Sequence, residues 1–291
     1  MSLLALLCTR AATPWTVAGL LVFILGMPIV LVLQFATMTI TNRADPGYRV
    51  PIGTVLRAWA GELAAAIRVF GWWQPFRSDA LQDCPDAGSA GGRAVLLVHG
   101  FGCNRGFWLP WLQRLRNEGR SYIALTLEPP WGPIERYAAA IEAAVMRLER
   151  QTGMPPVIVA HSMGGLAVRN WWVQTRVDRI HRLITLGSPH HGTVLARLGH
   201  LPNVRQMRRH NAWLQALFER EGEERRRRAS CFWSLCDNIV FPADTATLEG
   251  AANHRIVDIG HVAMVGHPAP WLETQRWLIV GARAGDARGQ D

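Results

Sequence analysis

A serine lies between a short apolar strand and a helix, in a turn made largely of small residues. The run PVIVA at 156–160 has the length and the β-branched composition of a buried strand, and AHSMGG follows it at 160–165. A helical pattern begins at once, over Met163–Gln174. A serine in such a sharp turn projects its hydroxyl beyond the edge of a sheet, because small neighbours let the strand and helix backbones come close. The pattern predicts that Ser162 is a nucleophile.

The chain after residue 92 alternates strand-like and helical patterns. Predicted strands lie at 93–98, 122–127, 156–160, 182–186, 231–235 and 255–259, and predicted helices at 108–117, 134–150, 163–174 and 271–280. Such alternation implies crossover connections, and therefore an α/β fold with a mostly parallel sheet and helices on both faces. Residues 189–230 form a longer, partly helical insert. It would sit above the carboxyl ends of the strands, where sites of this fold class lie, and could act as a lid.

A nucleophilic serine of this kind needs two donors for the negative oxygen of a tetrahedral intermediate. One is expected to be the backbone N–H of Met163, which follows the nucleophile. The other is expected from the loop after an earlier strand, and VHGFG at 98–102 closes the first predicted strand. The backbone N–H of Phe101 is therefore the second candidate. An HGFG loop alone is weakly specific, but ahead of AHSMGG it becomes a strong signal.

The serine also needs a base, and the base needs an orienting acid. On this type of sheet the chain order is serine, acid, histidine. His261 follows the last predicted strand, where the histidine is expected, and Asp237 follows the fifth. Asp237 would fix the tautomer of His261 rather than take its proton. Asp244 is the alternative acid, while Asp258 falls within the last predicted strand and is interpreted as structural.

Three other histidines lie near these motifs. His190 and His191 precede every candidate acid in the chain, so we interpret them as residues that shape a loop. His267 lies beyond the expected catalytic position and is interpreted as a surface or helix-start residue. The predicted catalytic set is therefore Ser162, Asp237 and His261.

Five segments, in order along the chain, carry a resemblance to a known family. They are VHGFG at 98–102, AHSMGG at 160–165, LGSPHHGT at 186–193, SLCDNIVFPA at 234–243 and GHVAM at 260–264. Over residues 93–280 the chain resembles bacterial triacylglycerol lipases and related esterases of the α/β-hydrolase superfamily. The resemblance implies an α/β-hydrolase fold without the first strands of larger members, hydrolysis of carboxylic esters, and no cofactor. It also implies an acid in the segment CDNIVFPA, which favours Asp237 over Asp244. The chain departs from the usual Gly-x-Ser-x-Gly at Ala160.

An apolar N-terminal segment predicts a membrane anchor. Val17–Ala36 carries no charge over twenty residues. A helix of that length spans roughly 30 Å, the thickness of the hydrocarbon core. No convincing small-residue cleavage site follows, which favours an uncleaved anchor over a secretory signal. We therefore expect a single-pass anchor, in a bacterial inner membrane. The arginines on either side of the span give opposing indications, so the side of the catalytic domain stays open.

The next segment has two interpretations. Ile52–Trp73 is apolar but is broken by Arg57, Glu62 and Arg68, so a second span would be costly. It is either an amphipathic helix lying on the membrane or a helix packed on the catalytic domain. A glycine-rich linker follows at 83–92. The expected organisation is an anchor (1–50), an interfacial helix and linker (51–92), a catalytic domain (93–281) and a disordered tail (282–291).

Charge and cysteine content add few constraints. All 31 basic residues are arginine and the net charge is +9, which we attribute to codon bias in a GC-rich genome. The basic residues are scattered apart from Arg225–Arg228, and no nucleic-acid motif accompanies them, so no nucleic-acid partner is expected. The five cysteines show no CxxC spacing, and no metal site is expected.

Together these patterns predict a serine hydrolase that cleaves lipid or another apolar acyl ester at a membrane. The same residues could instead act as a thioesterase, an amidase or a phospholipase. The alternative outside the enzymes is a membrane-bound binding protein that keeps the fold without catalysis. A missing member of the catalytic set would favour that alternative, and the sequence supplies all three.

Overall fold

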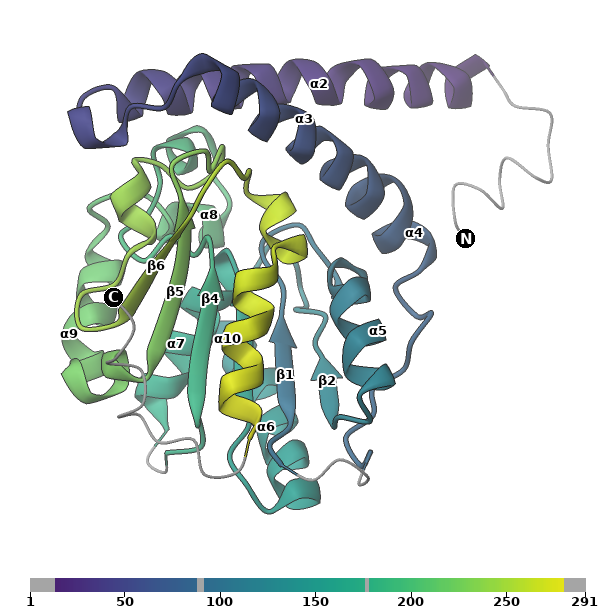
Figure 1. The fold of residues 1–291 in the computed structure, drawn as a ribbon, viewed down its shortest axis with the longest axis vertical. Helices are drawn as coiled ribbons and strands as arrows, with labels where there is room; N and C mark the ends of the chain where they lie inside the picture. The colour runs from purple at the N-terminus through teal and green to yellow at the C-terminus, as the bar shows by residue number, and fades with distance from the viewer. Residues whose placement is uncertain (1–13, 88–91, 176–177, 280–291) are drawn as a thin grey trace.

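A six-stranded sheet forms the centre of the computed structural model, which describes residues 14–87, 92–175 and 178–279, with side chains from residue 26 onward. The strand order is β2-β1-β3-β4-β5-β6 and every neighbouring pair is parallel (Figure 1). The strands are β1 (Val95–Val98), β2 (Tyr122–Ala124), β3 (Val157–His161), β4 (Arg182–Leu186), β5 (Ala229–Ser234) and β6 (Ala252–Ile256). The parallel sheet predicted from the alternating pattern is confirmed.

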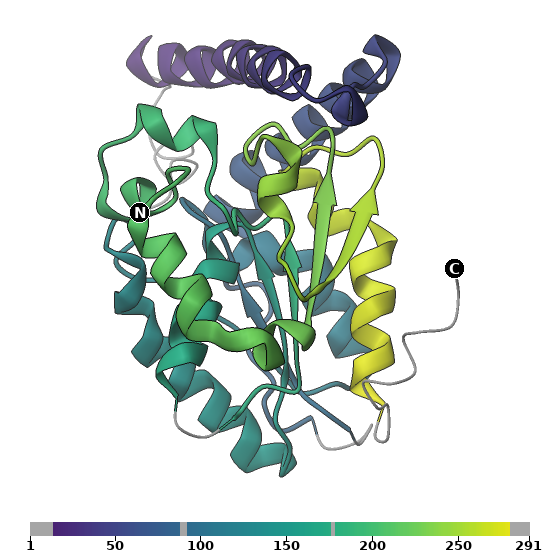
Figure 2. The same cartoon turned by 90° about the vertical axis from the view of Figure 1, so that its left-hand side faces the viewer.

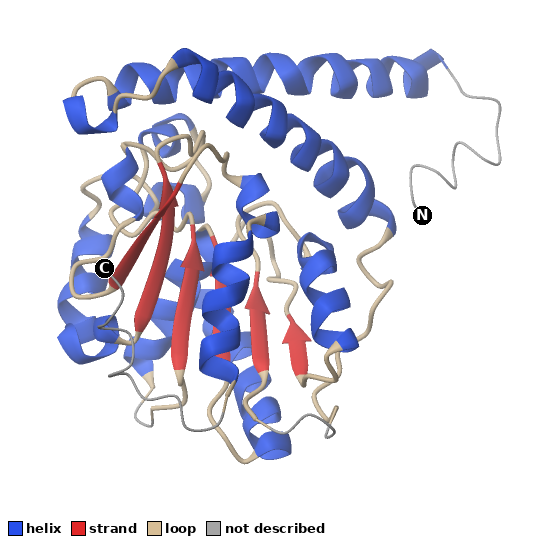
Figure 3. Cartoon of the chain, viewed as in Figure 1, coloured by secondary structure: helices blue, strands red, loops and turns tan. Residues whose placement is uncertain are grey.

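Helices cover both faces of this sheet (Figure 3). Successive side chains of a strand point to opposite faces, so Val95 and Leu97 pack on one side of β1 and Leu96 and Val98 on the other. The first side is covered by α5 (Leu109–Asn117) and α10 (Pro268–Leu278), the second by α6 (Ala138–Thr152), α7 (Met163–Gln174) and α9 (Ala212–Arg227). Burial on both faces explains why the strands read as continuous apolar runs.

Short helical turns shape the loops between these elements. The insert predicted after β4 folds as η5 (Val194–Leu198), α8 (Pro202–Gln206) and then α9. The other turns are η3 (Arg105–Trp108), η4 (Ile134–Tyr137), η6 (Ala243–Ala246) and η7 (Val262–Gly266). Of these, η7 begins directly after His261.

Several predicted boundaries shift at the edges of the sheet. β2 ends at Ala124, earlier than expected, and β5 begins at Ala229, within the predicted insert. β6 covers Ala252–Ile256 rather than 255–259, because it is an edge strand in which half-buried and exposed side chains alternate. Such a strand lacks the apolar run used to predict it. Asp258 consequently lies in the loop beyond the strand, with a φ of 57°, and its predicted place within the strand is wrong.

Two long helices from the N-terminal part lie across the carboxyl ends of the strands (Figure 1, Figure 2). The N-terminal elements are α2 (Pro14–Asn42), η1 (Pro46–Tyr48), α3 (Ile52–Arg68), the π-helical turn η2 (Val69–Trp73) and α4 (Gln74–Phe76). Phe35 and Met38 of α2 are buried in a cluster with Val55 and Ala58 of α3 and Phe241 of the sheet domain. Apolar contacts therefore dock the helix pair on the rest of the fold.

α2 contains the segment that the sequence predicts to span a membrane, Val17–Ala36. Side chains up to residue 25 of this segment lie outside the described residues. Among the residues that are described, no helix combines the length and the apolar composition needed to cross a membrane. The anchor therefore stays a prediction. The expected tail, 282–291, also lies outside the described residues.

The structure shows how the segment Ile52–Trp73 packs. One face of α3 is buried through Val55, Ala58, Glu62 and Ala66. Leu56 and Ile67, on an adjoining side of the helix, are exposed. α3 is therefore packed on the catalytic domain with a carboxylate, Glu62, on its buried face, and contact of its exposed side with a membrane stays a prediction.

Candidate active site

Ser162 lies in the turn between β3 and α7. Its backbone has φ 54° and ψ −128°, a strained conformation for a residue with a side chain. The N–H of Ser162 donates to the carbonyl of Leu186 on β4 at 2.8 Å, which holds the turn against the sheet. A Cβ at Gly164 would meet the carbonyl oxygens of Val98 and His99 at 2.6 and 2.5 Å. The helix and the neighbouring strand therefore approach too closely for any residue but glycine at this position.

The loop after β1 reaches the nucleophile. A Cβ on Gly100 would lie 2.8 Å from the Cβ of Ser162, so the loop packs directly on the serine. His99 fixes the shape of the loop. The N–H of Leu127 donates to His99 Nε2 at 2.9 Å, so the proton lies on Nδ1, which donates to the carbonyl of Gly100 at 2.8 Å. Burial lowers the pKa of His99 to about 4, so the ring is neutral near pH 7.

The two expected oxyanion donors lie on either side of Ser162. Phe101 follows Gly100 in the loop and lines the same cavity as the serine. Met163 opens α7, so no preceding turn offers an acceptor for its N–H. Among the described residues, neither N–H donates to a backbone group in the turns and loops around the site. Both are available to a ligand, and their role as oxyanion donors stays a prediction.

Asp237 and His261 form a buried hydrogen-bonded pair. His261 Nδ1 lies 3.0 Å from Asp237 Oδ2. The other carboxylate oxygen, Oδ1, accepts the N–H groups of Ile239 at 2.9 Å and Val240 at 2.8 Å. These bonds fix the carboxylate and leave Oδ2 for the imidazole. Because a carboxylate accepts, Nδ1 carries the proton and Nε2 remains as the basic nitrogen.

Further contacts hold the backbone around His261. Its N–H donates to Asn238 Oδ1 and its carbonyl accepts from His161 Nε2, both at 3.1 Å. Burial lowers the pKa of His161 well below the ordinary value, so this ring is neutral and donates from the nitrogen that carries its proton. The carboxylate of Glu62, on α3, accepts the N–H groups of the next two residues after His261, both at 2.9 Å.

Charges around His261 control its protonation. Burial alone would lower the pKa of His261. The charge and the hydrogen bond of Asp237, together with the charge of Glu62, outweigh burial and raise the pKa above its ordinary value. The surroundings therefore favour an imidazolium, which is the form that a general base reaches when it accepts a proton from serine.

Ser162 and His261 open on one cavity of about 850 Å³. Its walls are mainly apolar and come from separate parts of the chain: Val30 and Leu31 of α2, Phe70 of η2, Leu195 and Met207 of the insert, and Ile239. The N-terminal helices thus form one wall of the cavity, and the insert forms another. The space is large enough, and apolar enough, to hold an acyl chain.

The remaining sequence candidates lie away from this pair. Asp244 is exposed in η6, and Asp258 forms an ion pair with an arginine of α3. His190 is buried and His191 exposed, and neither lines the cavity. His267 caps α10 by accepting the N–H two residues on, as expected for a helix-start residue. The structure thus joins Asp237 to His261, places Ser162 on the same cavity as His261, and leaves these candidates outside; the catalytic roles of the three stay predictions.

Sequence reasoning missed the residues that support His261. His161 and Asn238 adjoin Ser162 and Asp237 in the chain, so a polar residue beside each predicted catalytic residue was the available signal. No such signal marks Glu62, because it lies in a distant N-terminal helix whose pattern indicates only an amphipathic surface.

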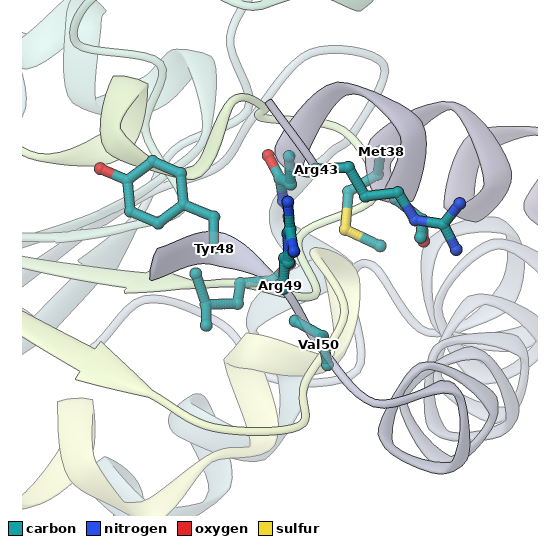
Figure 4. A pocket seen from close by; sticks show the side chains of 8 residues that line it. Met38, Arg43, Tyr48, Arg49 and Val50 are labelled. Carbon is teal, nitrogen blue, oxygen red and sulfur yellow. Dashed lines mark hydrogen bonds between the residues drawn. The ribbon is translucent and has the colours of Figure 1, made fainter. Parts of the chain in front are cut away.

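A second pocket, of about 350 Å³, lies where α2 leads into η1 (Figure 4). Arg43 and Tyr48 point in opposite directions from this stretch of chain. None of its lining residues lines the large cavity. Among the described residues, no three His, Cys, Asp or Glu side chains come together as a metal site.

Comparisons with known proteins agree with this architecture. No curated protein matches the chain. The fold is similar to that of the mature lipase BlEst2 of Bacillus licheniformis, at 16% identity over 65% of this chain and 93% of that chain, with a TM-score of 0.57. It is also similar to lipase B of Aspergillus fumigatus, at 16% identity over 66% and 54%, with a TM-score of 0.54.

At these identities the likeness to solved structures shows the fold alone. Family membership rests on a different observation. The family model described as the alpha/beta hydrolase family matches residues 95–290, from the first strand to beyond the last helix. The family resemblance seen in the sequence is confirmed, and this chain belongs to the alpha/beta hydrolase family.

Proposed function

We propose that this protein is a serine hydrolase that cleaves carboxylic esters with apolar acyl groups. The observation that carries the proposal is the shared cavity: Ser162 and His261 both line it, and its walls are mainly apolar. The bond between His261 Nδ1 and Asp237 supports the same assignment. Family membership makes hydrolysis the expected reaction, and the similar structures include proteins described as lipases.

The reaction would proceed through an acyl-enzyme. Ser162 Oγ attacks the ester carbonyl carbon while His261 Nε2 takes its proton, and Asp237 stabilises the resulting imidazolium. The N–H groups of Phe101 and Met163 bind the oxyanion. Collapse of the intermediate expels the alcohol, which takes the proton from His261. Water, activated by the same imidazole, then attacks the acyl-enzyme and releases the carboxylic acid.

We also propose that the protein acts at a membrane, through an N-terminal anchor in the bacterial inner membrane. Exposed apolar side chains on the two N-terminal helices support this placement: Ile29, Val32, Leu33, Ile40, Ile52 and Leu56. They would lie against lipid close to the cavity. The full-length protein is expected in the membrane fraction after an alkaline carbonate wash, and its release by that wash would contradict an anchor.

A series of p-nitrophenyl esters, from acetate to palmitate, tests the activity. We expect hydrolysis with a preference for longer acyl chains, because the cavity of about 850 Å³ has room for a long acyl chain and its walls are mainly apolar. Ser162→Ala should lower kcat by about 10,000-fold or more. Ser78→Ala, in the loop after α4, is the matched control and should keep full activity. Absence of hydrolysis by the folded wild type, or full activity in Ser162→Ala, would remove the proposal.

A further inference from the structure

A buried carboxylate from α3 contacts the segment that carries His261. Glu62 is 1% exposed. Its Oε1 accepts the N–H of Val262 and its Oε2 the N–H of Ala263, both at 2.9 Å. These N–H groups open η7, the helical turn that begins directly after His261. At the start of a helical turn such groups have no acceptor within the turn, so the carboxylate satisfies both.

The residues around Glu62 are small, which lets its carboxylate reach the loop that carries His261. A Cβ on Gly260 would lie 2.6 Å from Glu62 Oε2, so the glycine before His261 is required for the carboxylate to reach the loop. Ala58 and Ala66, one helical turn before and after Glu62, are also buried, and their small side chains keep α3 close. Burying a carboxylate is costly unless it is bonded, and both oxygens of Glu62 are.

We propose that Glu62 is a positioning residue for His261. It holds the backbone directly after the histidine and packs against Gly260 before it, so that the imidazole keeps its place in the cavity shared with Ser162 while it stays bonded to Asp237. Its charge also faces the ring that becomes cationic during the reaction. This inference rests on the proposed function and extends it, because it makes α3 a working part of the active site.

The groups that face His261 are few. Asp237 comes from the loop after β5, Glu62 from α3 and His161 from β3, with its ring centroid 4.5 Å from that of His261. Burial keeps His161 neutral because it lowers the pKa of that ring. Asp237 and Glu62 are therefore the charges that act on His261. Burial raises the pKa of Glu62, while its bonds to the N–H groups of Val262 and Ala263 and the charge of His261 favour the carboxylate. Removing the charge of Glu62 should lower the pKa of His261, so the decline of activity on the acid side should move to lower pH.

Glu62→Gln and Glu62→Ala in the full-length protein test the proposal. Glutamine has the same size and keeps one acceptor oxygen but carries no charge. We expect kcat to fall on the order of 10- to 100-fold in Glu62→Ala, with KM little changed, because a small misplacement of the base slows the chemical step. Glu62→Gln should recover part of that loss. In this variant the decline of activity on the acid side of the pH profile should lie at lower pH than in the wild type.

Arg57→Gln is the matched control. Arg57 also joins α3 to the loop before His261, through Asp258 at 2.8 Å, but its side chain is 66% exposed. An exposed ion pair contributes little, so this variant should keep the wild-type kcat and pH profile. The control separates general docking of α3 from the specific action of the buried carboxylate.

Labelling of Ser162 by a fluorophosphonate, measured per folded molecule, separates the possible failures. If the folded wild type is neither labelled nor active, the proposed function itself fails. If the wild type is labelled and Glu62→Gln shows the same kcat and the same decline of activity on the acid side, the positioning role is overturned. It is also overturned if both variants lose only thermal stability while kcat per folded molecule is unchanged, because Glu62 would then be a stabilising contact alone.

Discussion

The bond between Asp237 and His261 is packed so closely that one neighbouring position admits no side chain. Gly187 has a φ of 55°, and a Cβ there would lie 2.9 Å from Asp237 Oδ2 and 3.0 Å from His261 Nδ1. A methyl group would therefore press on both atoms of the hydrogen bond. This explains the first glycine of LGSPHHGT on physical grounds.

Gly187→Ala should consequently disturb catalysis more than folding. We expect the rate of fluorophosphonate labelling at Ser162 to fall on the order of 10- to 100-fold, because the imidazole is displaced. Gly153→Ala is the matched control, since Gly153 has a φ of 70° but open space around its Cβ. That variant should lose about 1–2 kcal/mol of stability from backbone strain and keep its labelling rate. Equal labelling rates in the two variants would contradict this account.

At this scale the sequence identifies the groups that would react but not those that hold them. Ser162, Asp237 and His261 each follow a strand within a short local motif, so their places at the sheet edge can be inferred from chain order. Glu62 acts from a helix distant in the sequence, and its contact depends on how α3 docks. No local pattern encodes a docking geometry, so a contact of this kind could not be predicted.

Among the elements, α2 combines two tasks. Its residues line the cavity, and Gln34 Oε1 accepts a hydrogen bond from Asn238 Nδ2 at 2.8 Å. Asn238 in turn accepts the N–H of His261. A continuous path of contacts therefore leads from α2 to the histidine, and a second one leads from α3 through Glu62. Both N-terminal helices touch the same segment of the site.

Phe35→Ala tests the docking of α2. Phe35 is 3% exposed, and a buried Phe→Ala change costs about 3–5 kcal/mol. We expect faster amide hydrogen exchange over residues 26–42, because the helix leaves the sheet domain more often. Leu33→Ala, at a position that is 62% exposed on the same helix, should leave the exchange unchanged. Unchanged protection in Phe35→Ala would show that α2 is not held by this cluster.

The hydrophobic periodicity predicts which central segments are strands and which are helices. It does not predict where the strands at the edges of the sheet begin and end. β3 and β4 are buried on both faces and match their predicted ranges closely, but β6 has alternating exposure and begins earlier than its apolar residues suggest. The apolar stripe of α3 fits a membrane surface and a protein surface equally well. The packing of Val55 and Ala58, which no pattern encodes, shows that one side of α3 lies on the catalytic domain.

In the whole molecule, the region matched by the family model does not complete the cavity by itself. The match begins at residue 95, after both N-terminal helices, yet α2 and α3 line the space that Ser162 and His261 share. The sheet supplies the reacting groups at its carboxyl edge, and the N-terminal helices cover that edge (Figure 1). Substrate selection should therefore depend on residues outside the matched region.

Fluorophosphonate labelling of the full-length protein, followed by mass spectrometry of its peptides, tests the central claim most directly. The probe requires an activated serine and no knowledge of the substrate. The account predicts a single adduct on Ser162, absent from Ser162→Ala and slowed about 1,000-fold or more in His261→Ala. A folded protein that gives no adduct on Ser162, or one whose labelling is unaffected by the loss of His261, would contradict it.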